Sequence, residues 1–197
     1  MSELVFWLEE PSAKAMLEGL IPRIALGVLF RCFPFEGKQD LERQLEKRLR
    51  GYNVPNARFV VLRDQDAEDC LQVKARLSAI CKMAGKPATL VRIACRELES
   101  WYLADLQAAE HGFGLKKLAT KQNVAKYRNP DRLSNAAEEF LRLTGMKYQK
   151  IAGSRAIGPH LDPANTRSTS FKNFVLGLCR LLAEPTTEQE LNPEVEP

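Results

Sequence analysis

Two aspartates follow a short, strongly apolar stretch near the middle of the chain. Phe59 to Leu62 is aromatic and branched, which is typical of a strand buried on both faces, and Asp64 and Asp66 come just after it. Ligands of open α/β sheets bind at the carboxyl ends of strands, so these acids lie where chemistry usually takes place. Two carboxylates at this spacing can converge on one hard cation, Mg²⁺ or Mn²⁺. The alternative is that they cap the next helix, because Asp is a common N-cap.

Two further predicted strands also end in a carboxylate. Leu4 to Leu8 has the pattern of a buried strand and is followed by Glu9, and Glu97 comes within three residues of the strand predicted over 88–94. These two glutamates and the two aspartates offer acceptor oxygens for one metal ion, or for two. They are the candidate catalytic and metal-binding acids.

The segments between these strands predict how the acids are positioned. Leucines four residues apart indicate an amphipathic helix over 38–50, and a second helical pattern covers 70–84. A helix with Ser12 as its N-cap follows the first strand, and a probable strand includes Val28 to Phe30. This alternation predicts an α/β fold with a mainly parallel sheet and helices on both faces.

The second half of the sequence has a different character. The patterns predict helices over 99–106, from Asn129 to Gly145, and around Phe171 to Leu182, with Trp101 in the core. We therefore expect a catalytic core over 1–105, a mostly helical, basic C-terminal part over 106–184, and an acidic tail over 185–197 that is too polar to pack.

Composition excludes several classes of protein. The chain has 197 residues, no apolar run long enough for a membrane span and no basic, apolar leader, so we expect a soluble cytoplasmic protein. Five cysteines at scattered spacings and only two histidines argue against a zinc site or a disulfide framework. We expect these cysteines to be reduced and mostly in the core: Cys32, Cys70, Cys81, Cys95 and Cys179.

Positive charge is concentrated in the helical part. Lys116, Lys117, Lys121 and Arg155 belong to stretches that contain few acids, although the net charge of the whole chain is only +4. Such stretches suit a polyanion, most commonly nucleic acid, and these four residues are the candidate nucleic-acid contacts. A basic surface that serves only solubility is an equally good interpretation of the charge.

The order of strand and glutamate, then strand and Asp-x-Asp, resembles the Toprim catalytic core shared by topoisomerases, bacterial primases and overcoming-lysogenisation-defect nucleases. The resemblance covers roughly residues 3–97. Glu9 matches the catalytic glutamate of the first Toprim motif, and Glu97 matches an acid that these nucleases carry after a later strand. Glu10 replaces the usual glycine, and Ala13 stands where a second metal-binding glutamate is common.

Two blocks, 63–70 and 92–105, and the late segment 148–171 resemble a Toprim-like domain-of-unknown-function family, number 4276. Such proteins are often encoded beside ABC-type ATPases of the overcoming-lysogenisation-defect type in anti-phage gene clusters. The resemblance therefore implies an ATPase partner and a defence role. It also makes Lys150 the candidate for a catalytic lysine, although a plain phosphate contact would suit this residue equally.

Two classes of function follow from these observations. The first is a Toprim-type nuclease that uses Mg²⁺ or Mn²⁺ to cut DNA or RNA, as the effector of an ATPase. The second is a binding or regulatory module of such an ATPase complex that does not cut. Ala13 in place of an acid favours the second class, whereas Glu9, Asp64, Asp66 and Glu97 together favour the first more strongly. The sequence leaves open the choice of DNA or RNA, the number of metal ions, the oligomeric state and the trigger.

Overall fold

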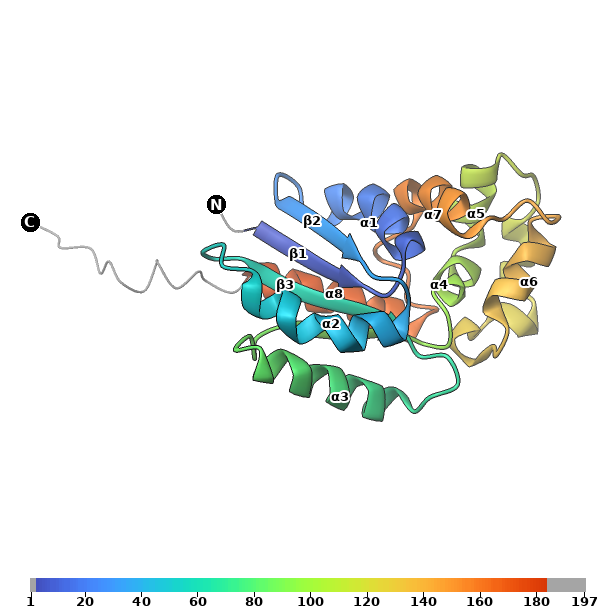
Figure 1. The fold of residues 1–197 in the computed structure, drawn as a ribbon. Coiled ribbons are helices and arrows are strands. Elements are labelled where there is room, and N and C mark those ends of the chain that lie inside the picture. Colours follow the sequence, from blue (N-terminus) through green and yellow to red (C-terminus); the bar gives the residue numbers. More distant parts are fainter. Residues whose placement is uncertain (1–2, 184–197) are drawn as a thin grey trace, which may run out of the picture.

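The computed structural model describes residues 3–183 of the chain. Four parallel strands form one sheet in the order β2-β1-β3-β4 (Figure 1). They are β1 (Glu3–Leu8), β2 (Leu29–Pro34), β3 (Arg58–Asp64) and β4 (Leu90–Ala94). The two inner strands, β1 and β3, are almost continuously buried, as their apolar sequences predict for strands that are covered on both faces.

Helices cover both faces of the sheet. One face packs against α2 (Lys38–Gly51) and α3 (Cys70–Met83), and the opposite face packs against α1 (Pro11–Ile24) and α8 (Thr169–Ala183) (Figure 1). Successive strand residues point to opposite faces, so alternate residues enter two separate cores. The predicted α/β class, the mainly parallel sheet and the helical C-terminal part are confirmed.

Between β4 and α8 the chain forms short helices beyond the carboxyl ends of the strands (Figure 1). The α-helices are α4 (Glu99–Ala104), α5 (Leu106–Phe113), α6 (Ala136–Leu143) and α7 (Lys150–Ile157). Four 3-10 turns connect them: η1 (Ala119–Asn123), η2 (Ala125–Tyr127), η3 (Pro130–Arg132) and η4 (Gly158–His160).

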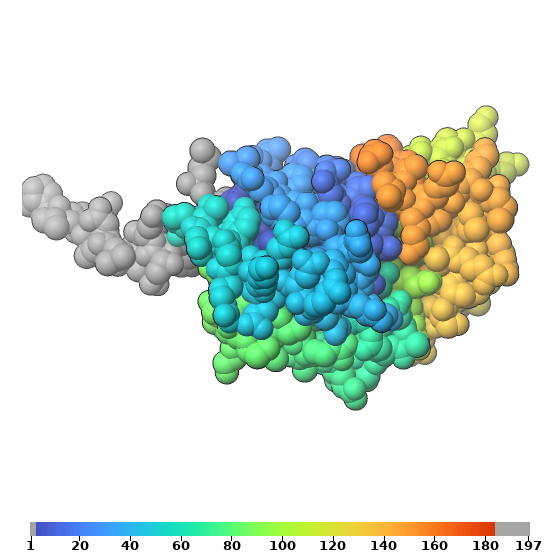
Figure 2. Space-filling model, viewed as in Figure 1, coloured from blue at the N-terminus to red at the C-terminus, as the bar shows by residue number. Residues whose placement is uncertain are grey.

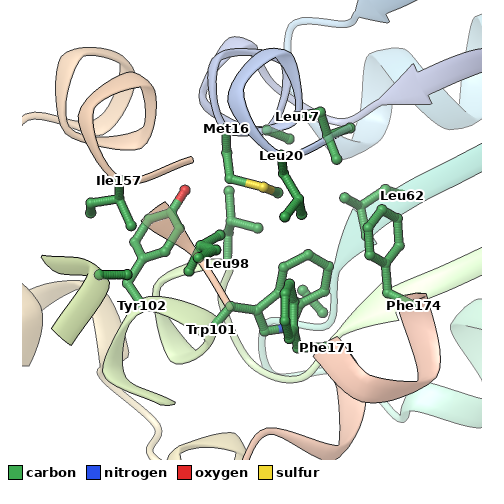
Figure 3. Close-up of a cluster of buried hydrophobic side chains, with 14 of the residues drawn as sticks. Met16, Leu17, Leu20, Leu62, Leu98, Trp101, Tyr102, Ile157, Phe171 and Phe174 are labelled. Atoms are coloured by element: carbon green, nitrogen blue, oxygen red, sulfur yellow. The ribbon is translucent and has the colours of Figure 1, made fainter. Parts of the chain in front are cut away.

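This helical part shares a hydrophobic core with one face of the sheet. Trp101 of α4 packs between Phe171 and Phe174 of α8, at ring-centroid distances of 5.2 and 5.1 Å, and reaches the same cluster as Leu62 of β3 (Figure 3). Fully burying a large side chain stabilises a fold by roughly 1.5–3 kcal/mol. The predicted core position of Trp101 is thus correct, and this core fixes the helices relative to the strand ends.

The helix α7 also packs closely against α1. Figure 2 shows α7, in orange, against α1, in blue, on the molecular surface. A Cβ atom on Gly158 would lie 2.3 Å from the backbone oxygen of Met16, so only glycine permits this contact. Gly158 follows α7 directly, so its contact with Met16 holds the preceding residues, Ile151 to Ile157, beside α1.

One predicted helix cap and one predicted helix start were wrong. The first helix begins at Pro11, and the Ser12 hydroxyl is buried without a hydrogen-bond partner instead of capping the helix. Residues 130–132 form only the 3-10 turn η3, and the regular helix starts at Ala136. Pro11 stands in the first turn of its helix as expected, whereas at Pro130 tertiary contacts delay the regular hydrogen bonding to Ala136.

All five cysteines are free thiols, with Cys81 buried and Cys179 exposed. None of the helices among residues 3–183 combines the length and the apolar character needed to cross a bilayer. The predicted acidic tail, residues 185–197, lies outside the described residues.

Candidate functional site

Glu9 and Asp64 meet at the carboxyl edge of the sheet. Their strands are adjacent and parallel, with Leu8 paired to Leu62, so both acids leave the sheet at the same level. The Asp64 backbone amide donates a hydrogen bond of 3.0 Å to Oε2 of Glu9, and the Glu9 amide donates to the Leu62 carbonyl at 3.2 Å. The structure thus places these two predicted site residues side by side.

The loops after β3 and β4 are tied to each other beside these acids. The Asp66 amide donates to the Arg96 carbonyl at 2.8 Å, and the Arg96 amide donates to the Gln65 side chain at 3.2 Å. Asp66 and Arg96 both have positive φ, of 55° and 63°. Aspartate adopts this left-handed region more readily than most residues, which suits Asp66 to its sharp turn.

Asp64 lies in an acid-rich environment. Burial raises the pKa of Asp64 well above its usual value, and repulsion from Glu99, Glu9 and Glu10 raises it further. A hydrogen bond from the Leu98 backbone opposes these effects only in part. Many protein atoms surround the Asp64 carboxyl group, but the residue as a whole is only half-buried and keeps some contact with solvent.

Glu99 is the buried acid that the sequence analysis did not place in the site. Its residue is only 1% exposed, and Oε1 accepts a hydrogen bond of 2.6 Å from the Tyr148 hydroxyl. Its other oxygen, Oε2, is buried and has no hydrogen-bond partner. Burial raises the pKa of Glu99, while Tyr148 and Lys150 act in the opposite direction. A buried carboxylate oxygen without a partner is costly, so this atom points to a missing cation or proton.

A second buried tyrosine extends this polar cluster. The Tyr102 hydroxyl donates to the Ser154 hydroxyl at 2.8 Å, and both residues are fully buried. Figure 3 shows Tyr102 within the buried cluster that also contains Met16 and Ile157. Burial raises the pKa values of Tyr102 and Tyr148, so both phenols stay protonated and donate. In the sequence, the only sign of this role is that Tyr102 lies near Glu99 and Tyr148 lies near Lys150, within the segments that resemble the family.

Lys150 reaches the acid cluster from α7. Its Nζ lies 3.1 and 3.2 Å from the two carboxylate oxygens of Glu10, 140 residues away in sequence. Burial lowers the pKa of Lys150, but attraction to Glu10, Glu99 and Asp64 outweighs it and raises the pKa overall. Lys150 is therefore charged and lies where a cation can act on the acid cluster.

Asp66 is close to the cluster but has a partner. Its Oδ2 accepts a hydrogen bond of 2.7 Å from Lys38 at the start of α2. Asp66 nevertheless contributes, after burial, to raising the pKa of Glu9. Its carboxylate thus acts on Glu9 electrostatically while Lys38 neutralises part of its charge.

Glu97 does something different from what its match implied. Its Oε2 accepts a hydrogen bond of 2.8 Å from the Ala137 backbone amide in the first turn of α6, where a carboxylate is stabilising. Glu99, two residues later, turns into the cluster instead. The four residues between β4 and α4 leave enough freedom for either glutamate to face the site, so strand position alone could not select between them.

The candidate nucleic-acid contacts are on the surface. Lys116, Lys117, Lys121 and Arg155 are all exposed; the first three flank or belong to η1, and Arg155 is on α7 with Lys150. Their exposure is compatible with either interpretation of the basic stretches.

The donor set suits Mg²⁺ or Mn²⁺, although the side chains are not arranged as a finished metal centre. Among residues 3–183, no three carboxylate, His or Cys side chains converge closely enough to hold an ion. The available ligands near Asp64 are carboxylate oxygens, as hard cations prefer, and one buried oxygen of Glu99 has no partner; burial first, and then repulsion from Glu99, Glu9 and Glu10, raise the pKa of Asp64. The chemistry of this set therefore fits a divalent cation.

Comparison with known proteins gives one family. Residues 8–179 match the family described as a domain of unknown function (DUF4276), which includes every acid of the cluster, Tyr148 and Lys150. No curated protein and no solved structure matches the chain. Since the match spans most of the sequence, the chain belongs to the DUF4276 family.

Proposed function

We propose that this protein is a divalent-metal-dependent nuclease of Toprim type that acts on DNA or RNA. The observation that carries the proposal is the acid cluster at the carboxyl ends of β1 and β3, where Glu9 and Asp64 are hydrogen-bonded and carry raised pKa values. The Toprim relationship rests on the resemblance of these motifs and is compatible with the parallel sheet.

In this proposal, Glu9 and Asp64 hold the cation and Asp66 joins them when its ion pair with Lys38 opens. Glu99 takes the place of Glu97 as the acid that follows β4, because Glu97 is occupied at the start of α6. A bound divalent ion would neutralise charge on the scissile phosphate and activate water. Lys150 supplies a fixed positive charge beside the cluster, which suits stabilisation of developing negative charge. The exposed Lys116, Lys117, Lys121 and Arg155 would contact the nucleic-acid backbone.

The resemblance to proteins encoded beside ABC-type ATPases supports a partner of that type and a role in anti-phage defence. In this scheme the chain is the effector, and the ATPase restrains or triggers it. Co-purification of the tagged protein from cells that carry the neighbouring genes tests the partnership.

A second candidate is a Toprim-like binding or regulatory module of such a complex that does not cut. Lys38 on Asp66 and Lys150 on Glu10 already neutralise two of the acids. Ala13, which stands at a common position of a second metal-binding glutamate, is 6% exposed and packs in the hydrophobic core. These observations favour a site that is stable without a metal ion.

Thermal melts in the presence and absence of millimolar Mn²⁺ test the nuclease proposal. The wild type should be stabilised by Mn²⁺, by about 2.7 kcal/mol when the ion is at 100 times its dissociation constant. Asp64→Asn should abolish both this stabilisation and cleavage of DNA or RNA, measured with the ATPase present. Asp69→Asn is the matched control, because Asp69 caps α3 through Gln72 outside the cluster and should leave both readouts unchanged.

The two candidates give different results. Stabilisation by Mn²⁺ with cleavage supports the nuclease, and loss of both in Asp64→Asn assigns them to the cluster. If the wild type neither gains stability from Mn²⁺ or Mg²⁺ nor cuts nucleic acid, the non-cleaving module becomes the better assignment.

A further inference from the structure

A second polar site lies at the edge of the sheet formed by β4. A pocket of about 240 Å³ is bounded by α3, β4 and the first three turns of α8. Three basic residues from these three elements line it, Lys74, Arg92 and Arg180, and no carboxylate is among the lining residues. Its polar lining is completed by Thr169, Ser170 and Asn173.

Arg92 is held in place by backbone atoms. Its Nε donates to the Asn173 carbonyl at 3.0 Å and its Nη1 donates to the Val91 carbonyl at 2.9 Å. A Cβ atom on Gly177 would lie 2.3 Å from Nη2, so a glycine at this position lets the guanidinium lie against α8. The orientation of Arg92 is therefore fixed before any ligand binds, which lowers the entropy cost of binding.

The positive charges of the pocket have no carboxylate partner among residues 3–183. Lys74, Arg92 and Arg180 form no ion pair with any described residue. Burial, followed by repulsion from Arg180, lowers the pKa of Arg92. Arg92 is half-buried and Arg180 is exposed, so the repulsion between them adds to the cost of burying Arg92, and a bound anion would offset both.

The neighbouring groups add little negative charge to the pocket. Burial raises the pKa of Cys95 to about 11 and also raises that of Cys70, so both lining thiols are neutral at physiological pH. The carboxylates that act on these thiols, Asp69 and Asp131, are both hydrogen-bonded, and Asp131 binds Ser170 of the pocket lining. Asp69 accepts from the Gln72 amide at 2.9 Å, and Asp131 accepts from the Ser168 hydroxyl and the Ser170 amide at 2.6 and 2.9 Å.

From this arrangement we infer that the pocket between α3, β4 and α8 binds a phosphate group through Lys74, Arg92 and Arg180. The planar guanidinium groups match the oxygens of a phosphate, and two of them with a lysine can neutralise its charge. The phosphate belongs either to a small phosphorylated molecule or to the backbone of a nucleic-acid strand. The inference is independent of the nuclease proposal, because none of these residues belongs to the acid cluster.

Titration of the full chain with pyrophosphate and, separately, with a short single-stranded oligonucleotide tests the inference at constant ionic strength. Arg180→Gln should weaken binding on the order of tenfold or more, which corresponds to one hydrogen bond to a charged group. Gly177→Ala should also weaken binding, although it keeps all three positive charges, because it displaces Arg92. Lys172→Gln removes an exposed charge from the same helix outside the pocket and should leave pyrophosphate binding unchanged.

The two titrations distinguish the sources of the phosphate. Saturable pyrophosphate binding that Arg180→Gln and Gly177→Ala weaken identifies a small phosphorylated ligand. Oligonucleotide binding with the same pattern, without measurable pyrophosphate binding, identifies a strand. The inference is overturned if neither probe binds, or if Lys172→Gln weakens binding as much as Arg180→Gln does.

Discussion

Arg63 and Asp64 are consecutive residues of β3, yet their charged groups occupy opposite environments. The Arg63 side chain has no exposed surface, and its guanidinium binds Glu42 at 2.6 Å and Glu68, with Glu9 at 3.7 Å. Asp64 faces Glu9, Glu10 and Glu99, with Lys150 as the nearby cation. Arg63 is a buried positive charge with several carboxylates around it, whereas Asp64, the next residue, is a carboxylate surrounded by other carboxylates.

The difference separates a charge that is satisfied by its partners from one that is not. A buried charge contributes to a stable fold only when its partners satisfy it, as Glu42 and Glu68 satisfy two nitrogens of Arg63. Clustered carboxylates with raised pKa values destabilise the folded protein, and such clusters are more typical of ligand sites than of stabilising contacts. Four substitutions would sharpen or break this distinction, and they follow in order of decreasing expected effect.

Replacing Arg63 should have the largest effect. Arg63→Met deletes two charge-assisted hydrogen bonds of a buried guanidinium, to Glu42 and Glu68, and should cost about 3 kcal/mol although both glutamates keep Arg76. Arg76 binds the same two glutamates from the surface, with a side chain that is 40% exposed, so Arg76→Met should cost only about 0–1 kcal/mol. Denaturant unfolding of both variants measures the difference, and equal losses would contradict a structural role for burial at Arg63.

Removing one hydroxyl from the acid cluster should have an intermediate effect. Tyr148→Phe deletes the 2.6 Å hydrogen bond to Glu99, whose other oxygen already lacks a partner, and should cost about 1–3 kcal/mol. Tyr127→Phe is the matched control, because Glu139 keeps its 2.5 Å ion pair with Lys126 after losing the Tyr127 hydroxyl. Thermal or denaturant melts should show the smaller loss for Tyr127→Phe, and the reverse order would argue that Glu99 is satisfied by other means.

Neutralising Asp64 should stabilise the protein without metal in a manner that depends on pH. Because the folded-state pKa of Asp64 is raised, the folded protein holds this proton at pH values where the unfolded chain has released it. The favourable contribution is therefore complete below the ordinary Asp pKa of about 4 and is lost as pH rises toward the folded pKa.

Asp64→Asn removes that loss, so its advantage over the wild type should be largest near neutral pH and shrink as the pH falls toward about 4. Parallel melts of both proteins between those pH values give the difference directly. Asp69→Asn, at the N-cap of α3, should have nearly the same stability as the wild type at every pH in this range. A destabilised Asp64→Asn protein would show that the carboxylate is held by favourable contacts.

Removing Lys38 should have the smallest effect on stability. Its ion pair with Asp66 joins side chains that are 42% and 36% exposed, and such pairs contribute about 0–1 kcal/mol. Lys38→Met should therefore change unfolding little but free Asp66, so the concentration of Mn²⁺ required for thermal stabilisation should fall. Unchanged Mn²⁺ dependence would place Asp66 outside the metal-binding set.

The sequence by itself determined the sheet and the first two acids of the site. Apolar runs such as Leu4 to Leu8 and Phe59 to Leu62 locate strands, and their alternation with helices predicts parallel pairing. Glu9 and Asp64 immediately follow or end their strands, where backbone geometry leaves little freedom. Their proximity follows from this local pattern alone.

Only the tertiary structure decided the remaining members. Glu97 and Glu99 both follow β4, and the choice between them depends on where α6 begins and where Tyr148 lies. Lys150 reaches Glu10 because α7 packs on α1 through Gly158, a contact between segments more than 130 residues apart. Hydrophobic periodicity records which face of an element is buried, whereas the partner of a polar side chain depends on long-range packing that no local pattern specifies.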